Sequence, residues 1–279
     1  MHGGWMRPGE RALFTLEGPD AARYLNGQLS CNILRVPPGT ARTGCLLTAK
    51  GKLCAHVHVW AGPSSFFLEC ESILLDDVQA RLEKYLIADD VSVTAELSAD
   101  PPVHVFGQPA PDGYLRIARL GVEGYDCSAP PDGVPEASPQ EIELLRIERG
   151  LPVWGRELAP ETLVQEARLE ESAVDFDKGC YVGQEVVSRL KSVGRVNSRL
   201  FGFVGALGEP PASGLVLHPL EHPEMVAGRI TSHALHFELA QTVALGYLHR
   251  QFDQLGRFTV TDSSGLPLGE VEKREFPII

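Results

Sequence analysis

Downstream of Leu200 the sequence changes to short apolar segments separated by turn residues, and this change limits what the chain can fold into. The segments recur at roughly ten-residue intervals, with Gly and Pro between them. They read LFGFVGAL, GLVLH, AGRITSHAL, QTVALGYLH, RFTVTD and LPLGEVEKREF. Such spacing is typical of a small antiparallel barrel or sandwich, because a turn closes each strand before the next begins.

The upstream part mixes hairpins and helices. RALFTLEG predicts a strand that ends at Gly18, and PDAARYLNGQLS predicts a short helix with Pro19 at its first position. Two apolar runs on either side of AKGK predict a hairpin, and ILLDDVQARLEKYLI has the period of an amphipathic helix. Because no βαβ repeat is present, the pattern favours an α+β fold over a doubly wound sheet.

The size and charge of the chain restrict its class. With 279 residues, 43% of them hydrophobic, it can bury the cores of two or three domains. It has no run of about 18 apolar residues and no signal-peptide pattern at its start, so we expect a cytoplasmic protein without a membrane partner. A formal charge of −12 argues against a broad, non-specific grip on nucleic acid.

The cysteines and histidines do not predict a metal site. The six cysteines lie at 31, 45, 54, 70, 127 and 180 without a C-x-x-C pair, so neither a zinc ribbon nor a chain-local iron–sulfur site is expected. His56 and His58 alternate along a predicted strand and share one face, but no third ligand accompanies them. LHPLEHPEM, with His218 and His222, reads as a surface loop.

The stretch DFDKGCYVGQEVVSRL, residues 175–190, is too particular for an ordinary loop. Gly179 and Gly183 flank Cys180 and permit close backbone approach, and QEVVSRL continues as a helix. A cysteine just ahead of a helix N-terminus, with Lys178 nearby, is favoured as the thiolate and is reactive. The alternative is a small buried side chain between turn glycines, and the residues alone favour neither.

The octapeptide KGCYVGQE resembles the K-G-C-Y-x-G-Q-E signature of the YgfZ family, folate-binding relatives of the glycine cleavage T protein, an aminomethyltransferase. Other segments are similar to that family in the same order: LEGPDAARYLNGQLSCNI, RLGVEGYDC, ELLRIERGLPVWGREL, AGRITSHAL and VALGYLHR. The resemblance runs roughly from Leu13 to Arg250. It implies a T-protein-like α+β fold, with two interlocked α+β modules around a central folate channel and a C-terminal antiparallel β-barrel.

The resemblance also implies domain limits and a ligand, tetrahydrofolate or a derivative. The expected divisions are a folate-binding α+β domain over 1–45 and 113–197, an inserted α+β module over 46–112, and the barrel over 198–279. Trp5 and Trp154 could stack on the ligand rings, but neither matches a family position and both stay unassigned.

Four residues are candidates for holding the cofactor. Asp126 occupies the place of the family's pterin-binding glutamate, where a carboxylate accepts hydrogen bonds from the ring, and Arg146 matches a folate-proximal arginine. The other two candidates are Tyr125 and Gln184. Without the resemblance, Asp126 would be a turn residue, and Arg146 a solvated helix charge or the partner of Glu143.

One departure from the T protein bears on the reaction. Where that protein has Gly-Gly-x-x-Asp-Asp, TAKGKLCAHVH has no acid, so a conventional aminomethyltransferase is not expected. The resemblance implies a folate-binding accessory protein for iron–sulfur cluster assembly or repair in client enzymes, including tRNA-modifying ones, with Cys180 as the reactive thiol and Lys178 beside it. The alternative is a tetrahydrofolate-dependent one-carbon transferase. A weaker alternative is direct tRNA binding through the basic run Arg189, Lys191, Arg195 and Arg199.

Overall fold

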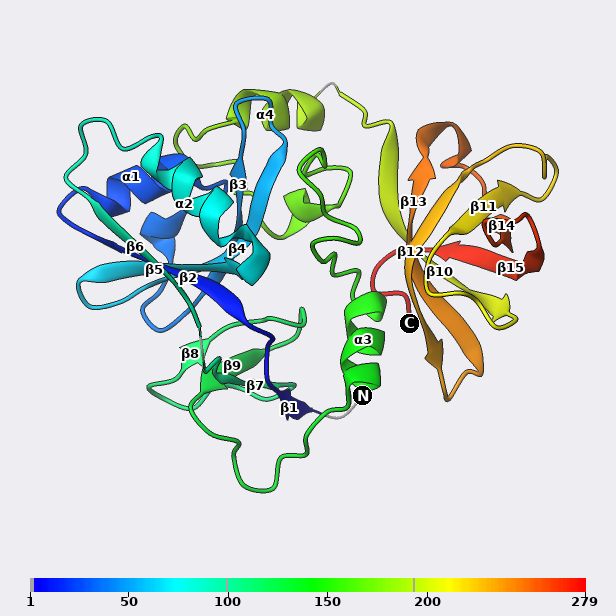
Figure 1. Cartoon of the computed structure of the whole chain (residues 1–279), viewed down its shortest axis with the longest axis horizontal. Coiled ribbons are helices and arrows are strands. Elements are labelled where there is room, and N and C mark those ends of the chain that lie inside the picture. Colours follow the sequence, from blue (N-terminus) through cyan, green and yellow to red (C-terminus); the bar gives the residue numbers. More distant parts are fainter. Residues whose placement is uncertain (1–2, 99, 193) are drawn as a thin grey trace. The chain divides into compact units, whose positions relative to one another are not determined.

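The computed structural model describes residues 3–98, 100–192 and 194–279, which separate into two compact units (Figure 1). Unit 1 comprises Met1–Ala137, Pro160–Val164 and Leu169–Gly194, and unit 2 comprises Ser138–Ala159, Gln165–Arg168 and Arg195–Ile279. The sequence suggested a division into three parts with other limits, and that division stays a prediction. Each unit is described by itself.

Unit 1 contains a five-stranded antiparallel sheet in the order β3-β4-β5-β2-β6. Its strands are β2 (Arg11–Glu17), β3 (Arg42–Leu47), β4 (Leu53–Ala61), β5 (Ser65–Glu71) and β6 (Ser92–Leu97). Two helices, α1 (Ala21–Gln28) and α2 (Leu75–Glu83), accompany it. The predicted hairpin around AKGK is confirmed as β3 and β4. The helix prediction was wrong in one detail, because α1 begins at Ala21 after Asp20 at the N-cap position, and Pro19 therefore lies outside the helix.

Buried and less buried residues alternate along β2 and β4, which gives these strands one apolar and one more polar face. Along β4 the buried residues are Leu53, Ala55, Val57 and Val59, and the residues between them are Cys54, His56, His58 and Trp60. Successive side chains of a strand point to opposite faces. The side chains of Cys54, His56, His58 and Trp60 therefore lie on the opposite face of the sheet from Leu53, Ala55, Val57 and Val59.

A smaller four-stranded sheet in the order β1-β7-β9-β8 belongs to the same unit. Its strands are β1 (Gly4–Met6), β7 (Val103–Phe106), β8 (Leu115–Arg116) and β9 (Gly124–Cys127). Trp5 on β1 packs against a cluster formed by Val103, Val105, Tyr125 and Cys127. The helix predicted from QEVVSRL is confirmed as α4 (Gln184–Ser192), also in unit 1.

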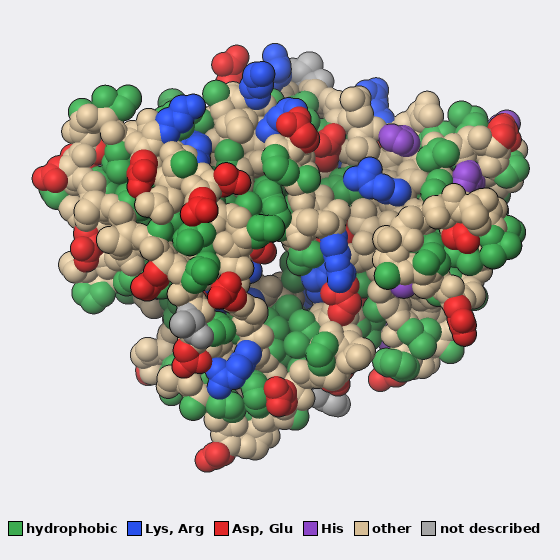
Figure 2. All heavy atoms as spheres, in the orientation of Figure 1, with side chains coloured by type: hydrophobic (Ala, Val, Ile, Leu, Met, Phe, Trp, Pro, Cys, Tyr) green, Lys and Arg blue, Asp and Glu red, His purple; other side chains and the backbone are tan. Residues whose placement is uncertain are grey.

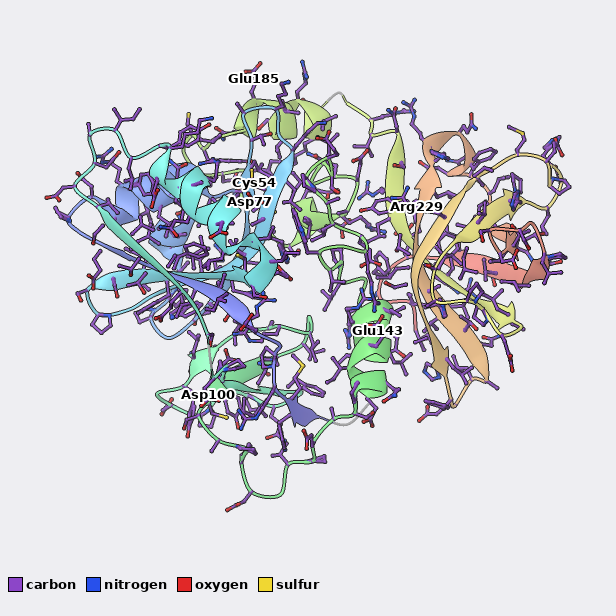
Figure 3. The ribbon with its side chains drawn as sticks, in the orientation of Figure 1. Cys54, Asp77, Asp100, Glu143, Glu185 and Arg229 are labelled. Carbon is purple, nitrogen blue, oxygen red and sulfur yellow. The ribbon has the colours of Figure 1, made fainter. Side chains whose placement is uncertain are left out.

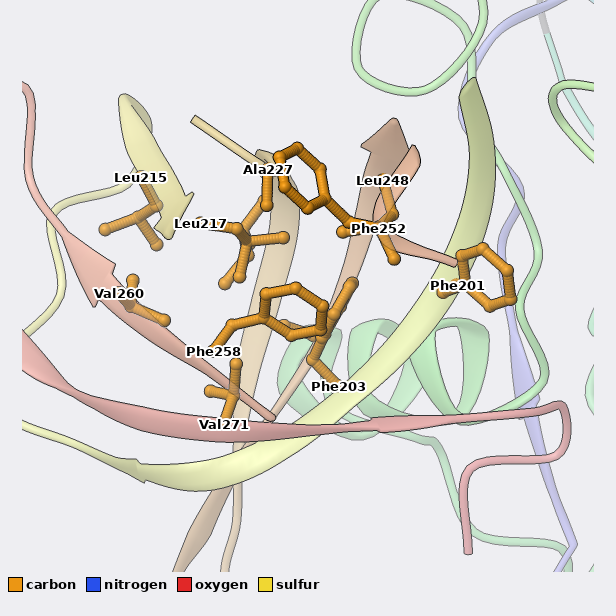
Figure 4. Close-up of a cluster of buried hydrophobic side chains, with 12 residues drawn as sticks. Phe201, Phe203, Leu215, Leu217, Ala227, Leu248, Phe252, Phe258, Val260 and Val271 are labelled. Atoms are coloured by element: carbon orange, nitrogen blue, oxygen red, sulfur yellow. The ribbon is translucent and has the colours of Figure 1, made fainter. Parts of the chain in front are cut away.

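Unit 2 contains helix α3 (Pro139–Glu148) and a closed barrel in the order β10-β13-β12-β11-β14-β15. The strands are β10 (Ser198–Leu207), β11 (Leu215–Pro219), β12 (Gly228–His236), β13 (Gln241–His249), β14 (Arg257–Thr261) and β15 (Pro267–Arg274). Phe203 and Phe258 meet edge to face at 6.0 Å in the barrel core (Figure 4). The predicted barrel is therefore confirmed.

Helix α3 begins with a capping box. The Ser138 hydroxyl accepts a hydrogen bond from the Glu141 backbone N–H, and the Glu141 carboxylate accepts one from the Ser138 N–H. Among the described residues, no helix combines the length and the apolar character needed to cross a membrane.

Candidate functional site

A pocket of about 520 Å³ lies in unit 1 and takes its lining from both sheets. Leu13 and Trp60 come from the five-stranded sheet, Leu115 comes from β8 of the four-stranded one, and Tyr114 directly precedes β8. Asp100, labelled in Figure 3, lies on the connection between β6 and β7 and also lines the pocket. These walls are mainly aromatic and aliphatic, and the volume suits a drug-sized ligand.

Charged side chains from both sheets meet at this pocket. Glu69 on β5 and Asp126 on β9 line it together with Arg11. The Arg119 guanidinium donates to both carboxylates, with Nη2 at 2.8 Å from Glu69 Oε2 and 2.6 Å from Asp126 Oδ2. Arg11 Nε donates to Glu69 Oε1 at 3.1 Å, and His104 Nδ1 donates to Asp126 Oδ1 at 2.9 Å. The result is a continuous buried chain of alternating charge that joins the two sheets.

The protonation states in this chain follow from its contacts. Burial alone would raise the Asp126 pKa, but hydrogen bonds from His104 and Arg119 outweigh it and hold the pKa of this carboxyl below its usual value. Burial also opposes the charge of Arg119, and yet its bonds to Glu69 and Asp126 raise the Arg119 pKa. Both groups are therefore charged at neutral pH, and Asp126 can act only as an acceptor.

Two histidines extend the polar face of the five-stranded sheet. The imidazole centroids of His56 and His58 are 6.2 Å apart on β4, and His58 lies directly across from Glu69 in the strand register. Burial lowers the pKa of both, and the Arg119 charge lowers that of His58 further. Both imidazoles are therefore neutral at pH 7. Among the described residues, no group of three His, Cys, Asp or Glu side chains could hold a metal ion.

The predicted cofactor residues Tyr125 and Asp126 face opposite sides of β9 because they are adjacent in a strand. Asp126 lines the pocket. Tyr125 instead packs in the small-sheet cluster, and its ring lies 5.4 Å from that of Tyr114. The structure thus gives Asp126 a place at the pocket and gives Tyr125 a packing role. Asp126 is a buried strand residue and not a turn residue.

Cys180 is exposed, and the other five cysteines are buried or half-buried; all six are free. Its loop is held against the hairpin of β3 and β4. Gly183 has a φ of +87°, and a Cβ there would lie 2.6 Å from the Thr48 carbonyl oxygen. A Cβ on Gly51 would likewise lie 2.8 Å from Val186 Cβ. Gly183 therefore serves close backbone approach, as the sequence indicated, whereas a Cβ on Gly179 would meet nothing within 4 Å.

Lys178 does not extend into solvent beside Cys180. Its ammonium is buried and donates to the backbone carbonyls of Asn26 at 2.6 Å, Leu29 at 2.6 Å and Cys31 at 2.7 Å. Burial lowers the pKa of Lys178 to about 8. The lysine therefore satisfies carbonyls at the end of α1, and in doing so it anchors the start of the Cys180 loop.

Gln184 is the first residue of α4 and is half-buried, and its backbone N–H donates to the Tyr181 carbonyl at 3.2 Å. Basic side chains gather at the top of Figure 2, near α4. Arg189 and Lys191 are exposed in the last turn of this helix. Arg195 and Arg199 belong to unit 2, so the basic run of the sequence is divided between the units.

Arg146 lies on α3 in unit 2, where it is buried. Its guanidinium donates to Glu143 at 2.7 and 2.9 Å, to the Leu151 carbonyl at 2.8 Å and to Glu157 at 3.2 Å (Glu143 is labelled in Figure 3). The pairing with Glu143 that the sequence offered as an alternative is therefore present, and Arg146 is not a solvated helix charge.

The sequence did not single out Trp60, Glu69 and Arg119. Trp154 belongs to unit 2, and Trp5 lies on β1 and packs against the small-sheet cluster, so the pocket tryptophan is the one on β4. A signal for Trp60 and Glu69 was present, because each continues the alternate, non-core positions of its strand. Nothing in the local pattern around Arg119 indicates its partners, because they come from two different sheets.

Several known proteins are similar to this chain over most of its length. No protein-family model matches the chain. It is 31% identical over 245 residues to the iron-sulfur cluster assembly factor IBA57, mitochondrial, of Mus musculus, covering 74% of this chain and 67% of that protein. It is 27% identical over 237 residues to the tRNA-modifying protein YgfZ of Sodalis glossinidius, covering 73% and 72%.

Among solved structures, the chain is similar to the glycine cleavage system aminomethyltransferase T from Bartonella henselae. The TM-score is 0.81 at 18% identity, covering 100% of this chain and 86% of that one. This likeness confirms the predicted T-protein-like α+β fold with its C-terminal antiparallel barrel. At this identity it is evidence for the fold alone and not for a function.

Proposed function

Because the chain belongs to the family of YgfZ and IBA57, we propose that it is a folate-binding accessory protein that supports iron–sulfur cluster assembly or repair in client enzymes. The clients would include enzymes that modify tRNA. One relative is named as an iron–sulfur cluster assembly factor and another as a tRNA-modifying protein, and both names fit such a role.

The pocket of unit 1 is the observation that carries the folate part of this proposal. A pteridine is a flat, neutral ring with N–H donors along one edge. The pocket offers Trp60 and Tyr114 as ring surfaces and carboxylates at Glu69 and Asp126 as acceptors. Tetrahydrofolate or a derivative bound there would supply one-carbon or reducing chemistry, and these residues would hold and orient its ring.

Cys180 is the proposed reactive group. A single exposed thiol can ligate one iron with loss of its proton, or take one sulfane sulfur from a persulfide donor whose thiol is released, whereas a cluster takes four ligands. The remaining five cysteines are less accessible. Burial raises the pKa of Cys31 to about 11 and that of Cys70 to about 12, which disfavours their thiolates. Cys180 would therefore act transiently on a client, with Lys178 anchoring its loop.

The other predicted folate contacts stay proposals. Arg146 and Gln184 were predicted to touch the folate, but Arg146 already binds Glu143, Glu157 and a carbonyl in unit 2. Tyr125 is packed inside the small sheet. A cytoplasmic location is likewise proposed, and six free cysteines fit a reducing compartment.

Complementation in cells tests this function. In a bacterial strain that lacks its own YgfZ-type protein, the wild-type chain should restore the product of an iron–sulfur tRNA-modifying enzyme, measured in digested tRNA by mass spectrometry. Cys180→Ser should restore less than about a tenth of it. Cys54→Ser, which changes a half-buried cysteine on β4, is the matched control and should restore it fully. Equal restoration by both variants would contradict the role of Cys180.

A tetrahydrofolate-dependent one-carbon transferase remains the competing function. It predicts transfer of a formaldehyde equivalent to or from tetrahydrofolate by the purified chain, in a reaction indifferent to Cys180→Ser. Direct tRNA binding predicts an affinity that falls steeply with salt, because counterion release would drive it. Either result would replace the accessory role proposed above.

A further inference from the structure

Arg119 binds both pocket carboxylates in the same two-point way. Its Nη1 and Nη2 donate in parallel to Glu69 Oε1 at 2.5 Å and Oε2 at 2.8 Å. Its Nε and Nη2 donate in parallel to Asp126 Oδ1 at 3.1 Å and Oδ2 at 2.6 Å. Paired bonds of this kind fix a carboxylate in distance and in orientation. Glu69 Oε2 and Asp126 Oδ2 share the donor Nη2, so they are neighbours although they come from different sheets.

Each of these carboxylates has one acceptor site left. A carboxylate offers about four such sites, two on each oxygen. Glu69 accepts three hydrogens, two from Arg119 and one from Arg11 Nε on Oε1. Asp126 also accepts three, two from Arg119 and one from His104 Nδ1 on Oδ1. The single Nε hydrogen of Arg119 is shared with Oδ2, and a further donor at Oδ2 would leave it to Oδ1, the nearer oxygen.

Both carboxylates reach the pocket, while Arg119 lies behind them. Glu69 and Asp126 line the pocket, and Arg119 is not among the described residues that do. Their side chains are only 6% and 7% exposed, so little bulk water can fill the open sites. In a two-point pair each oxygen uses the site beside its partner oxygen. The remaining site on Oε2 therefore points toward Asp126, and the remaining site on Oδ2 points toward Glu69.

An amino group on a flat ring matches this arrangement. Its nitrogen carries two diverging hydrogens, as Arg119 Nη2 does, so one amino group can donate to Oε2 and Oδ2 at once. The walls suit a ring, because Leu13 and Trp60 line the pocket and Leu13 lies directly across from Glu69 in the strand register. A carbonyl oxygen in place of the amino group would face two ionised carboxylates and would be rejected.

We propose that Glu69 and Asp126 together form one acceptor for a ring amino group, with Arg119 as the positioning residue that holds their oxygens side by side. The inference rests on the function proposed above only where it identifies the ring as a reduced pterin, whose 2-amino group is then the donor. Arg119 also keeps both carboxyls ionised, because two buried carboxyls this close would otherwise share a proton. Neither carboxylate suffices alone, so the pair sets the preference of the pocket for amino over oxo rings.

Two probes that differ at one position test the pair. They are 6-methyltetrahydropterin and its 2-oxo analogue, in which an oxygen replaces the amino group, and both are titrated by anaerobic calorimetry at neutral pH. The proteins are wild type, Glu69→Ala and Asp126→Ala, each shown by urea denaturation to be folded. Each variant removes one acceptor, while the other carboxylate still holds Arg119 by two bonds.

Glu71→Ala is the matched control. Glu71 lies on the same strand as Glu69 and also pairs with Arg11, but it is not among the described residues that line the pocket. Wild type and this control should bind the amino probe at least about tenfold more tightly than the oxo probe. In Glu69→Ala and in Asp126→Ala this ratio should fall at least about threefold, because one of two bonds is lost.

A role in folding alone would weaken both probes alike and would leave the ratio of their dissociation constants unchanged. A ratio below about tenfold in wild type would overturn the two-carboxylate acceptor. So would a ratio that falls by less than about threefold in either single variant, because one carboxylate would then suffice.

Arg119→Met tests the positioning role. Both carboxyls remain in this variant but would share a proton, so the affinity for the amino probe should fall at least about threefold from pH 8 to 6.5. Arg11 and His104 keep their contacts with the pair, and His58 lies across from Glu69 as before. In wild type the affinity should change by less than about twofold over this range. A variant as independent of pH as wild type would contradict the role of Arg119.

Simpler probes separate this inference from the folate proposal. If tetrahydrofolate fails to bind, but 2-aminopyrimidin-4-one binds by ligand-observed NMR through both carboxylates and uracil does not, folate is the wrong ligand and the acceptor assignment stands. If tetrahydrofolate binds but the preference for amino over oxo is absent, only the acceptor assignment is wrong. If none of the amino-bearing probes binds the wild-type chain up to about a millimolar, both are wrong.

Discussion

Each compact unit buries an arginine between two carboxylates. The two clusters differ in whether a carboxylate acceptor site stays open. In unit 2, Glu157 Oε1 accepts from the hydroxyls of Thr231 at 2.7 Å and Ser232 at 2.6 Å. Its Oε2 accepts from the Val153 N–H at 3.0 Å and from Arg146 at 3.2 Å. All four acceptor sites are filled, and the side chain is 0% exposed.

In unit 1 the corresponding arginine is Arg119, and its partner Glu69 keeps one site open at the edge of a pocket. A buried ion pair alone therefore does not mark a functional site, because such pairs also join structural elements. The open acceptor beside accessible space makes the difference. The Arg146 cluster therefore has the contacts of a structural ion pair, and the Arg119 cluster lies at the pocket for which ligand binding is proposed.

The largest expected effect on stability is that of Arg146→Met. It would leave Glu157 buried and without its cation, which costs about 3–5 kcal/mol of unfolding free energy. Urea denaturation measures this loss. Arg149→Met, which changes the exposed C-cap residue of the same helix, is the control and should stay within about 0.5 kcal/mol of wild type. A loss below about 1 kcal/mol for Arg146→Met would contradict the structural role.

Arg119→Met should cost less, about 2–3 kcal/mol, because Glu69 and Asp126 border a pocket that water can enter. The added substitution Glu69→Gln should recover part of the loss, which a double-mutant cycle in urea would detect. If Arg119→Met destabilises the chain more than Arg146→Met, the two clusters do not differ as argued.

Acid should weaken unit 1 before unit 2. Folding lowers the pKa of His56 and His58 below 6.5, so the unfolded chain takes up their protons first. Their contribution to stability is complete above pH 6.5 and is lost as the pH falls below it, by on the order of 1–2 kcal/mol between pH 7 and 5.5.

In unit 2 the pKa values of Glu141, Glu143, Asp262 and Glu272 are lowered, and Glu143 is the half-buried one among them. Burial would raise its pKa, but the bond from Arg146 outweighs burial and lowers the pKa below 4.5. Its contribution is therefore lost only below that pH. Hydrogen exchange resolved by peptide should show protection falling in β4 and β5 between pH 7 and 5.5, after correction for the intrinsic rate. The double variant His56→Gln, His58→Gln should flatten the change, and equal losses in the barrel strands would refute this origin.

Cys180→Ser should have the smallest effect on stability, within about 0.5 kcal/mol of wild type, because the side chain is exposed. Lys178→Met is the contrasting change in the same loop. It removes the donor of three carbonyls and should cost roughly 1–3 kcal/mol. Urea denaturation of both variants tests whether Lys178 stabilises the fold while Cys180 does not. Similar losses of unfolding free energy for the two variants would contradict this division of roles.

The sequence predicted those features that depend on local pattern. The alternation in RALFTLEG and in the strands after Leu200 reports a face that packs on a core, and a period of two residues is readable from any single strand. The start of α4 and the close approach at Gly183 were equally local. Pro19 was expected at the first helical position, but α1 begins at Ala21, and the Asp20 side chain makes no capping bond to α1 but accepts from the Asp90 N–H.

Contacts between residues far apart in the chain could not be predicted from local pattern. Arg119 joins Glu69 to Asp126 only because the two sheets of unit 1 come together there. The direction of the Lys178 side chain is another example, since its acceptors lie about 150 positions earlier in the chain. Spacing alone also could not tell that Tyr125 packs in a core while Asp126 faces the pocket, because the phase of a short strand is ambiguous.

Titration of tetrahydrofolate by calorimetry without oxygen tests most directly whether the pocket of unit 1 is the folate site. The wild-type chain and Cys180→Ser should bind with equal affinity, because Cys180 does not line the pocket. Trp60→Ala should bind at least about tenfold more weakly, since a ring surface of the pocket is lost. No heat of binding to wild type up to about a millimolar, or unchanged binding in Trp60→Ala, would contradict it.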